Sequence, residues 1–465
     1  MGTMMTYEDF LKQKQIKAVS SGFDVNVKEI NPMLFDFQKD IVRWCLKKGK
    51  SAIWADCGLG KTPMQLEWSY QVHKKTGGDI LIVAPLAVTN QTAREGIKFG
   101  YEVNVCRKQE DVKPGINITN YEMLKYFDED KFIGIVLDES SILKSFTGKY
   151  RNLIIDKFKH TSYKLSCTAT PAPNDYMELG SHAEFTGVMT RTEMLSTFFV
   201  HDGGDTSKWR LKGHAEDEFW KWISTWAVVL QKPSDLGYED GDFILPELNI
   251  HEVIVESPKD PSCMFPKIAQ TLHERRQARR DSLEKRVEKS AELANANDEQ
   301  WVVWCDLNIE SEKLTKAIDG AVEVKGPDKP EHKINTAIGF ADGDIRTIVT
   351  KPSIFGWGLN WQHCSNMIFT GLSDSYEQFY QAVRRIWRFG QKEPVNVYIV
   401  ISEAEGAVKK NIQRKEKDTT KMMSEMVKHT QKILTEEIHG TIRETIEYHP
   451  TEKMELPKWL KEAIW

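Results

Sequence analysis

Short apolar runs alternate with amphipathic helical segments over residues 30–185. The runs lack the apolar–polar alternation of a half-exposed strand, which indicates strands buried on both faces, as in a parallel sheet covered by helices. They are SAIWAD (51–56), DILIVAP (79–85), FIGIVLDE (132–139) and YKLSCTATP (163–171), and the pattern returns in QWVVWCD (300–306), IRTIVTK (345–351), NMIFTG (366–371) and NVYIVIS (396–402). The sequence therefore predicts an α/β protein of two doubly wound lobes.

The segment between these blocks, residues 186–295, has a different character. EFWKWISTWAVVL (218–230) predicts a helix, and the helical spacing of its large apolar residues favours core packing over stacking on bases; these residues are Phe219, Trp222, Ile223 and Trp226. HERRQARRDSLEKRVEKSAEL (273–293) predicts a charged helix with two i,i+4 arginine rows, Arg275 with Arg279 and Arg276 with Arg280. Two interpretations stay open for it, a solvated helix and a stripe that follows phosphates.

Composition bounds the class of protein. With 465 residues, 40% hydrophobic and 28% charged, the chain can bury a large core and is long enough for two or three domains. The net charge of -5 argues against a protein coated in positive charge, but it leaves room for a local basic groove. The seven cysteines include no CxxC pair, which fits a reducing compartment and gives no zinc signature. No apolar run approaches the ~18 residues of a membrane span, so we expect a cytoplasmic protein with no membrane partner.

The stretch ADCGLGKT (55–62) follows a predicted strand and opens a predicted helix, which is the context of a phosphate-binding loop. In that role backbone N–H groups wrap the β-phosphate of ATP, Lys61 reaches the β- and γ-phosphate oxygens, and the Thr62 hydroxyl holds Mg²⁺. Gly58 and Gly60 allow the close approach of the backbone. Because Ala55 stands where the general G-x-x-x-x-G-K-[ST] pattern has its first glycine, a chance loop-to-helix turn stays an alternative.

The stretch FIGIVLDES (132–140) supplies the second half of such a site. It predicts an apolar strand that ends in two carboxylates, of which Asp138 positions Mg²⁺ and Glu139 orients and deprotonates the attacking water. Its order and distance behind the phosphate loop argue against a chance turn. Together the two motifs predict a nucleoside triphosphatase.

The stretch QFYQAVRRIWRFGQ (378–391) raises a question of charge. It brings Arg384, Arg385 and Arg388 together on what the pattern predicts to be one helix, with no carboxylate among them. On a helix Arg384 and Arg388 share a face, while Arg385 points about 100° away from Arg384. The three arginines therefore cannot all face one partner.

A series of motifs connects these stretches. In order, they are FDFQKD (35–40), ADCGLGKT (55–62), VAPLAVTNQ (83–91), ITNYEML (118–124), LDESSILK (137–144), SCTATP (166–171), FGWGLNW (355–361) and QAVRRIWRFGQ (381–391). The chain resembles the superfamily 2 helicase-like ATPases, most specifically their Swi/Snf-type branch, in a compact bacterial or bacteriophage form. A D-E-x-x-x-x-K element, here ending at Lys144, and a closing Q-A-x-x-R-x-x-R-x-G-Q are distinctive of that branch. The chain departs from it at Ser140 and Ser141, which replace the usual Ala-His.

The resemblance implies two tandem RecA-like parallel-sheet lobes with a helical insertion between them, and ATP with Mg²⁺ bound in the cleft. The implied catalytic residues are Lys61, Glu139, Gln381, Arg385 and Arg388. The implied nucleotide-binding residues are Phe35, Gln38, Gly58, Leu59, Gly60, Lys61, Thr62, Gly356 and Gly358, among which Gln38 reads adenine. The implied Mg²⁺ ligands are Thr62 and Asp138, the coupling residues are Thr168 and Thr170, and the segments along the nucleic-acid track contain Pro85, Leu86, Thr119 and Asn120.

The resemblance also implies that Arg385 and Arg388 face the γ-phosphate of ATP, so that ATP brings the negative charge that neutralises them. Arg384 is left over, and we expect it to pair with a nearby acid such as Glu377. The tail from residue 406 predicts a charged helix packed as a brace on the second lobe. The expected segments are an N-terminal extension (1–30), the ATP-binding lobe (31–190), the helical insertion (191–245), a linker with the charged helix (246–295), the second lobe (296–425) and a helical tail (426–465).

These inferences favour a DNA-stimulated ATPase that acts as a motor on DNA, with the duplex favoured and a monomer expected. Binding of ATP closes the lobes and hydrolysis opens them, and a different grip on the phosphate backbone in the two states makes steps. Strand separation is left open. The alternatives are an RNA-dependent ATPase or helicase and a DNA-binding scaffold whose ATPase has decayed.

Overall fold

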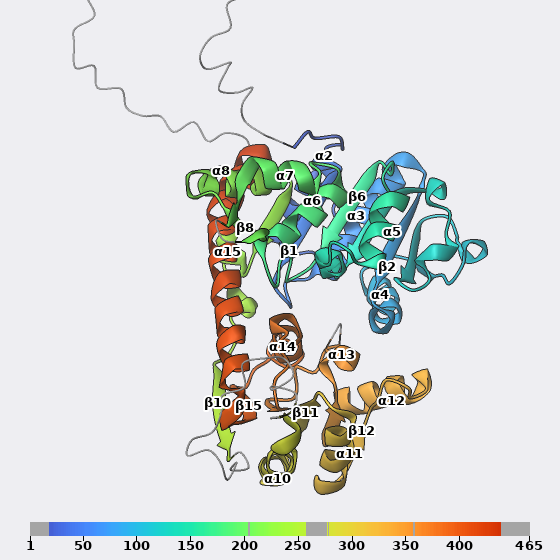
Figure 1. Ribbon diagram of the computed structural model, residues 1–465. Helices are drawn as coiled ribbons and strands as arrows, with labels where there is room; N and C mark the ends of the chain where they lie inside the picture. The colour runs from blue at the N-terminus through green and yellow to red at the C-terminus, as the bar shows by residue number, and fades with distance from the viewer. Residues whose placement is uncertain (1–17, 203–204, 257–276, 278, 357–358, 439–465) are drawn as a thin grey trace, which may run out of the picture.

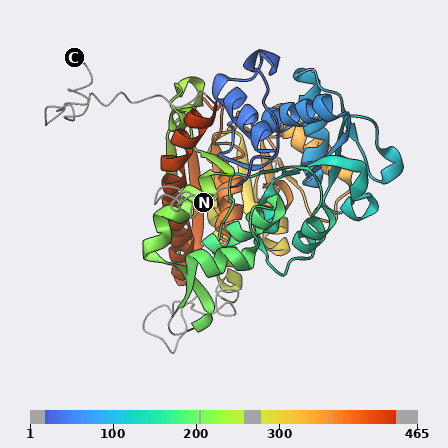
Figure 2. The same cartoon turned by 90° about the horizontal axis from the view of Figure 1, so that it is seen from above.

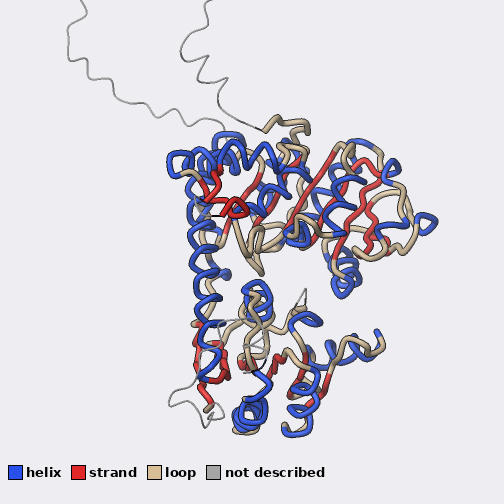
Figure 3. The backbone as a smooth tube through the Cα atoms, viewed as in Figure 1, coloured by secondary structure: helices blue, strands red, loops and turns tan. Residues whose placement is uncertain are grey.

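The computed structural model describes residues 18–202, 205–256, 277, 279–356 and 359–438. These residues form two α/β lobes, the first coloured blue to green and the second yellow to orange in Figure 1. Strands of each lobe run between helices (Figure 3). Within these ranges, no helix has the length and apolarity needed to cross a bilayer.

The first lobe is built on a seven-stranded parallel sheet in the order β3-β4-β2-β5-β6-β1-β9. Its strands are β1 (Lys50–Ala55), β2 (Asp79–Ala84), β3 (Val103–Val105), β4 (Ile116–Asn120), β5 (Phe132–Asp138), β6 (Tyr163–Cys167) and β9 (Ala227–Leu230). The central strands are almost wholly buried, as their continuous apolar runs predict. The helices are α2 (Asp36–Lys48), α3 (Lys61–Thr76), α4 (Leu86–Lys98), α5 (Lys149–Lys157), α6 (Leu179–Thr186), α7 (Arg191–Phe198) and α8 (Glu216–Ser224).

The second lobe is built on a six-stranded parallel sheet in the order β10-β15-β14-β11-β13-β12. Its strands are β10 (Leu248–Val255), β11 (Trp301–Cys305), β12 (Ala321–Glu323), β13 (Thr347–Thr350), β14 (Asn366–Thr370) and β15 (Val395–Ser402). Its helices are α10 (Leu283–Ala294), α11 (Asn308–Ala317), α12 (Pro330–Ala341), α13 (Pro352–Phe355) and α14 (Tyr376–Val383). The two parallel sheets confirm the predicted fold class.

The segment between the lobes differs from its prediction in two ways. The prediction of one helix over 218–230 is wrong at its C-terminal end, because α8 stops at Ser224. The run that follows, which contains two valines, forms β9 at the edge of the first sheet, where it pairs with β1. An antiparallel hairpin of β7 (Phe199–Asp202) and β8 (Asp205–Leu211) precedes α8. The core interpretation of the aromatic residues is confirmed, because Phe219 and Trp226 are fully buried.

The segment expected to be a linker with a charged helix contributes a strand to the second sheet. β10 pairs with β15 over its whole length. Arg279, expected in a row of arginines, is buried and forms ion pairs with Asp306 and Glu405. A buried, paired guanidinium cannot follow a phosphate backbone, so that interpretation is wrong for Arg279. Arg275 and Arg276 lie outside the described residues.

A single long helix, α15 (Gly406–Ile438), runs past both lobes on one side of the molecule (Figures 1 and 2). Val408 and Ile412 pack into the core of the second lobe. Farther along, Met422 and Met426 pack into the aromatic cluster around α8, and Leu434 reaches the main core of the first lobe. The predicted packing on the second lobe is confirmed, and the apolar face of the helix also continues onto the first lobe, which was not expected.

Candidate active site

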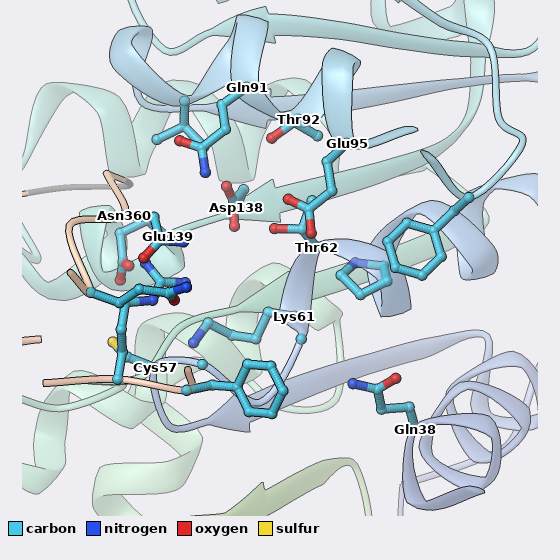
Figure 4. A pocket seen from close by; sticks show the side chains of 18 of the residues that line it. Gln38, Cys57, Lys61, Thr62, Gln91, Thr92, Glu95, Asp138, Glu139 and Asn360 are labelled. Carbon is cyan, nitrogen blue, oxygen red and sulfur yellow. The ribbon is translucent and has the colours of Figure 1, made fainter. Parts of the chain in front are cut away.

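A cavity of about 310 Å³ lies between the lobes. The first lobe contributes the phosphate loop, α4 and the end of β5, and the second lobe contributes the segment around residues 360–389. Figure 4 shows Lys61, Thr62, Asp138 and Glu139 around one end of this space and Gln38 at the other. Residues far apart in the sequence thus meet in one site, as the motifs predict.

The phosphate loop leaves β1 and enters α3, which begins at Lys61. Gly60 has φ 78°, and a Cβ there would lie 2.2 Å from the Nε2 atom of Gln38, so the turn requires glycine. The Nζ atom of Lys61 donates hydrogen bonds to the carbonyl oxygens of Ala55 at 2.8 Å and Asp56 at 3.1 Å. In the described part of the chain, no carboxylate lies within ion-pair distance of Lys61, so its charge is available to an anion in the cavity.

Gly58, the other glycine of the loop, faces the second lobe. It has φ 91°, and a Cβ there would lie 2.9 Å from the backbone nitrogen of Phe389. A side chain at this position would therefore push the lobes apart. Gly58 was expected to allow the close approach of phosphate, and it also allows the close approach of the second lobe.

Two carboxylates stand at the end of β5. Asp138 accepts a hydrogen bond from the Nε2 atom of Gln65 at 2.8 Å, and burial raises its pKa. Glu139 has φ 61° and is, among the described residues, the one non-glycine with positive φ. Such a backbone costs about 1–3 kcal/mol and persists where the surrounding structure fixes it. The turn aims the Glu139 carboxylate into the cavity (Figure 4).

The SCTATP segment holds Glu139 from behind. The hydroxyl of Thr168 donates a hydrogen bond to the Glu139 carboxylate, and the backbone N–H of Thr170 donates to the Thr168 oxygen at 3.0 Å. Both threonine side chains are buried. Any movement of this segment would therefore shift Glu139. The coupling role of Thr168 and Thr170 stays a prediction, and the hydrogen bond from Thr168 to Glu139 is its physical basis.

The environment of Glu139 sets its proton affinity. Burial raises the pKa of Glu139 to about 7, against the opposing charge of Lys61, and Glu377 and Asp138 raise it further. A general base must be ionised to accept a proton, and a base with a pKa near the working pH is well suited to the task. Glu139 has the electrostatics of a general base.

We expect kcat/KM for ATP hydrolysis to fall as the pH drops below about 7, since Glu139 is then protonated in the free protein. The expected slope is about tenfold per pH unit on the acidic side. Initial rates at low ATP concentration, measured from about pH 5.5 to about pH 9, check this expectation. Glu139→Gln serves as the control, whose residual rate should lack the transition. A wild-type profile that stays flat through pH 7 would contradict the assignment.

The second lobe supplies two arginines. α14 ends at Val383, so Arg384, Arg385 and Arg388 lie on the turns that follow it, and the prediction of one continuous helix is wrong. The Nη1 atoms of Arg385 and Arg388 each donate to the carbonyl of Leu359 at 3.0 Å. Arg385 also donates to the Gln381 side-chain oxygen at 3.1 Å, while the Nε2 atom of Gln381 has no partner within the described structure.

These two arginines have no ion-pair partner in the described part of the chain. Arg385 and Arg388 line the cavity, and in the described structure neither has a carboxylate within ion-pair distance. Burial lowers the pKa of Arg385 to about 10, and the charge of Arg388 lowers it further. Burial also lowers the pKa of Arg388, while the carboxylate of Glu95 raises it. Desolvated cations without a counter-ion are costly, so the cavity favours a polyanion.

Aromatic residues form the far end of the cavity. Phe35 is 47% exposed and contacts Phe243 edge to face, with ring centroids 5.0 Å apart, and Phe243 contacts Phe389 at 4.8 Å. The Gln38 side chain accepts from the N–H of Phe35 and donates to the carbonyl of Leu59, both at 3.0 Å. Gln38 therefore supports the phosphate loop directly, and its reading of adenine stays a prediction.

Two glycines of the second lobe, Gly356 and Gly358, were expected to approach the nucleotide. Gly356 caps α13 and is absent from the cavity lining, and Gly358 lies outside the described residues. Asn360 and Gln362 line the cavity from this side instead. They stand just after the FGWGLNW glycines, so the motif locates the segment, and the roles of Gly356 and Gly358 stay predictions.

The four residues expected on the nucleic-acid track fall into different environments. Pro85 lines the cavity itself, and Leu86 is 62% exposed on the first turn of α4. Thr119 is buried, and the Asn120 side chain accepts hydrogen bonds from two backbone N–H groups of its own turn. Only Leu86 presents a largely exposed side chain.

Other residues line the cavity without having been assigned a role from the sequence, although five of them lie in the quoted motifs. They are Met33, Cys57, Pro63, Val88, Gln91, Thr92, Glu95, Phe99, Phe243, Asn360, Gln362 and Phe389. Phe389 lies inside the closing arginine motif at an unspecified position, so that motif carried a signal for it. Phe243 lies in no motif and reaches the site through the chain path between the lobes.

The expected partner of Arg384 is different in the structure. Arg384 forms its ion pair with Asp56 of the phosphate loop, and Glu377 pairs with Lys144 of the first lobe. The prediction that Arg384 pairs with Glu377 is therefore wrong. Each of these two ion pairs connects one lobe to the other.

The residues present fit a Mg²⁺ ion that binds together with a nucleotide. Thr62 and Asp138 line the same cavity as Lys61. Within the described ranges there is no group of three or more histidine, cysteine, aspartate or glutamate residues that could hold a metal by themselves. Mg²⁺ typically binds through one or two carboxylates plus substrate phosphates, which agrees with this sparse donor set.

Residues 12–173 match the protein family described as the res subunit of type III restriction enzymes. The matched segment contains the phosphate loop, Asp138 and Glu139, and the SCTATP residues. Among solved structures, the chain is similar to the SWI2/SNF2 ATPase core of Sulfolobus solfataricus in complex with double-stranded DNA. That likeness covers 90% of this chain and 99% of the other, with 17% sequence identity and a TM-score of 0.43. No curated protein matches the chain.

Proposed function

We propose that this chain, with the two-lobed fold and motifs of a superfamily 2 helicase-like ATPase, hydrolyses ATP in the cavity between its lobes and uses the cycle to move along DNA. The observation that carries the hydrolysis is the convergence of Lys61, Arg385 and Arg388 on a cavity that also holds Asp138 and Glu139. Cations that form no ion pair with the protein, beside a general base, are an arrangement suited to phosphoryl transfer to water.

The roles divide between the lobes. Lys61 and the backbone of the phosphate loop bind the β- and γ-phosphates, and Glu139 orients the attacking water and accepts its proton. Arg385 and Arg388 stabilise the charge that develops in the transition state, with Gln381 fixing Arg385 through its side-chain oxygen. When bound, Mg²⁺ on Thr62 and Asp138 would neutralise charge on the phosphate oxygens.

The proposal of movement rests on the division of the site. Lys61 and Glu139 belong to the first lobe and the arginines to the second, so the site is complete only while the lobes are together. A nucleotide that binds this arrangement more tightly than a separated one shifts the population of lobe positions during each cycle. Nucleic acid held across both lobes would then be gripped differently in the two states.

DNA is proposed as the track on two grounds. The closing Q-A-x-x-R-x-x-R-x-G-Q is typical of the duplex-DNA branch, and the matched family is that of a restriction-enzyme subunit. The RNA-dependent alternative has the same site and differs only in the track. The scaffold with a decayed ATPase is disfavoured because Lys61, Thr62, Asp138, Glu139, Arg385 and Arg388 are all present.

A panel of nucleic acids tests the proposal. We expect phosphate release to be stimulated most by double-stranded DNA, less by single-stranded DNA and least by RNA of equal length. Glu139→Gln, measured in parallel, accounts for any contaminating ATPase. Strongest stimulation by RNA would select the RNA-dependent alternative, and no stimulated hydrolysis by any of the three would select the scaffold.

Movement itself needs a second measurement. A third strand bound to a DNA duplex is displaced by a motor that moves along the duplex, without separation of the two duplex strands. We expect ATP-dependent displacement of that third strand by the wild-type protein. DNA-stimulated hydrolysis without displacement would leave an ATPase that does not translocate.

A further inference from the structure

The phosphate loop is tied directly to the second lobe through Asp56. The guanidinium of Arg384 and the hydroxyl of Tyr380 both donate to the Asp56 carboxylate, across the gap between the lobes. Asp56 and Arg384 are only 8% and 6% exposed. The Arg384 guanidinium also lies over the Trp387 ring, 4.3 Å from its centroid.

We propose that Asp56 and Arg384 form a latch between the lobes, in which Arg384 is a positioning residue that sets how Arg385 and Lys61 meet across the cavity. This inference rests on the proposed function and deepens it. Arg384 is absent from the cavity lining, so it does not itself face the nucleotide. Its role would be to fix the two halves of the site relative to each other.

Each end of the latch adjoins a catalytic group. Lys61 donates a hydrogen bond to the backbone carbonyl of Asp56 at 3.1 Å, so the residue held by the second lobe also helps to hold Lys61. On the other side, Arg385 is the next residue after Arg384. Fixing the Arg384 side chain on the loop therefore fixes the backbone from which Arg385 enters the cavity.

A second ion pair holds the opposite end of the same helix. Glu377, on the first turn of α14, is buried and pairs with Lys144 of the first lobe. Lys144 lies at the end of the short helical segment that starts right after Glu139. The two ends of α14 are thus attached to the two halves of the first-lobe site, the phosphate loop and the Asp138–Glu139 turn.

The physical chemistry of buried ion pairs favours a positioning role over a simple gain in stability. Removing two charges from water offsets much of their attraction, so such a pair adds little net stability, whereas one charge left alone in the interior is strongly unfavourable. The pair therefore specifies one arrangement of the lobes. When the lobes separate, Asp56 and Arg384 can each return to water.

A double-mutant cycle tests the latch. The variants are Arg384→Met, Asp56→Asn and the two combined, and each is measured for kcat and KM with saturating double-stranded DNA. We expect each single change to lower kcat about 10- to 100-fold, the effect of misplacing catalytic groups by about 1 Å, with a much smaller change in KM for ATP. The combined variant should lose no more than either single one, because the pair acts as a unit.

Two further variants separate positioning from other roles. Arg384→Lys keeps the charge and should recover part of the lost kcat. Arg414→Met removes an exposed arginine of α15, whose partner Asp418 is one helical turn away, and should keep wild-type kcat and KM. Losses that multiply in the combined variant, or a raised KM with unchanged kcat, would overturn the latch.

A readout without hydrolysis keeps the latch distinguishable from the proposed function. In nucleotide-free protein, Arg384→Met should speed amide hydrogen exchange in both residues 55–62 and residues 376–388, since each segment loses its partner in the other lobe. The combined variant covers the case in which a single change unfolds the protein. A wild-type protein that hydrolyses no ATP would overturn the proposed function, and unchanged exchange in both segments would overturn the latch.

Discussion

Glu139→Gln is expected to abolish DNA-stimulated ATP turnover while leaving the fold intact. A positioned general base contributes about 10²- to 10⁴-fold to a rate, and the glutamine side chain cannot accept the proton of the attacking water. The substitution keeps the size of the side chain and an oxygen that can accept from the Thr168 hydroxyl. It also removes a carboxylate whose ionisation is opposed by burial, so it should not destabilise the folded state.

Lys61→Ala should abolish turnover by a different route. It removes the one cation of the phosphate loop, and we expect weaker ATP binding together with the loss of hydrolysis. Nucleotide binding, measured by fluorescence, distinguishes the two variants, because the Glu139→Gln variant should still bind ATP. Thermal unfolding serves as the measure of fold for both.

Glu178 offers a matched control for Glu139. Burial also raises the pKa of Glu178 to about 7, but Glu178 lies outside the cavity and accepts hydrogen bonds from Asn174. Glu178→Gln should therefore hydrolyse ATP at the wild-type rate. If turnover in Glu139→Gln or Lys61→Ala came within a few-fold of wild type, the assignment of the site would fail.

Arg385→Ala is expected to slow hydrolysis about 10³- to 10⁵-fold, or roughly 4–7 kcal/mol of barrier, the usual effect of removing an arginine that stabilises the transition state of phosphoryl transfer. ATP binding should change much less, because Lys61 and the phosphate loop belong to the other lobe. Single-turnover hydrolysis and equilibrium binding of a fluorescent ATP analogue measure the two effects separately.

Arg385→Lys sharpens this prediction. Arg385 uses its planar guanidinium to reach Gln381 and Leu359 at the same time, and an ammonium group cannot reproduce that geometry. We therefore expect Arg385→Lys to recover little activity, in contrast to Arg384→Lys. A variant of Arg385 with weakened ATP binding and a normal maximal rate would assign this residue to ground-state binding instead.

The phosphate-facing part of the first-lobe site could be predicted from the sequence because its charged residues lie just after strands. Lys61 follows β1 and Glu139 follows β5, which flank β6, and the carboxyl ends of parallel strands lie at one edge of a sheet. Local sequence fixes these positions. The two sheets themselves were predictable for the same reason, from continuous apolar runs that only a covered sheet can bury.

Contacts between the lobes could not be predicted in this way. The partner of Arg384 depends on where α14 ends and on which part of the other lobe faces it, and Asp56 is more than three hundred residues away. The acid nearest in sequence, Glu377, is drawn to Lys144 instead. Phe243 joins the site through the chain path between the lobes, which no local pattern encodes.

The order in which a ribosome makes the chain gives α15 one more consequence. Domains generally fold as units with the N-terminal one first during synthesis. Here Met422, Met426 and Leu434 complete the cores of the first lobe, although they are made after the whole second lobe. Until α15 is synthesised, the apolar surface of the first lobe that α15 covers therefore stays exposed. Neither lobe can complete its core packing before nearly all of the described chain has been synthesised.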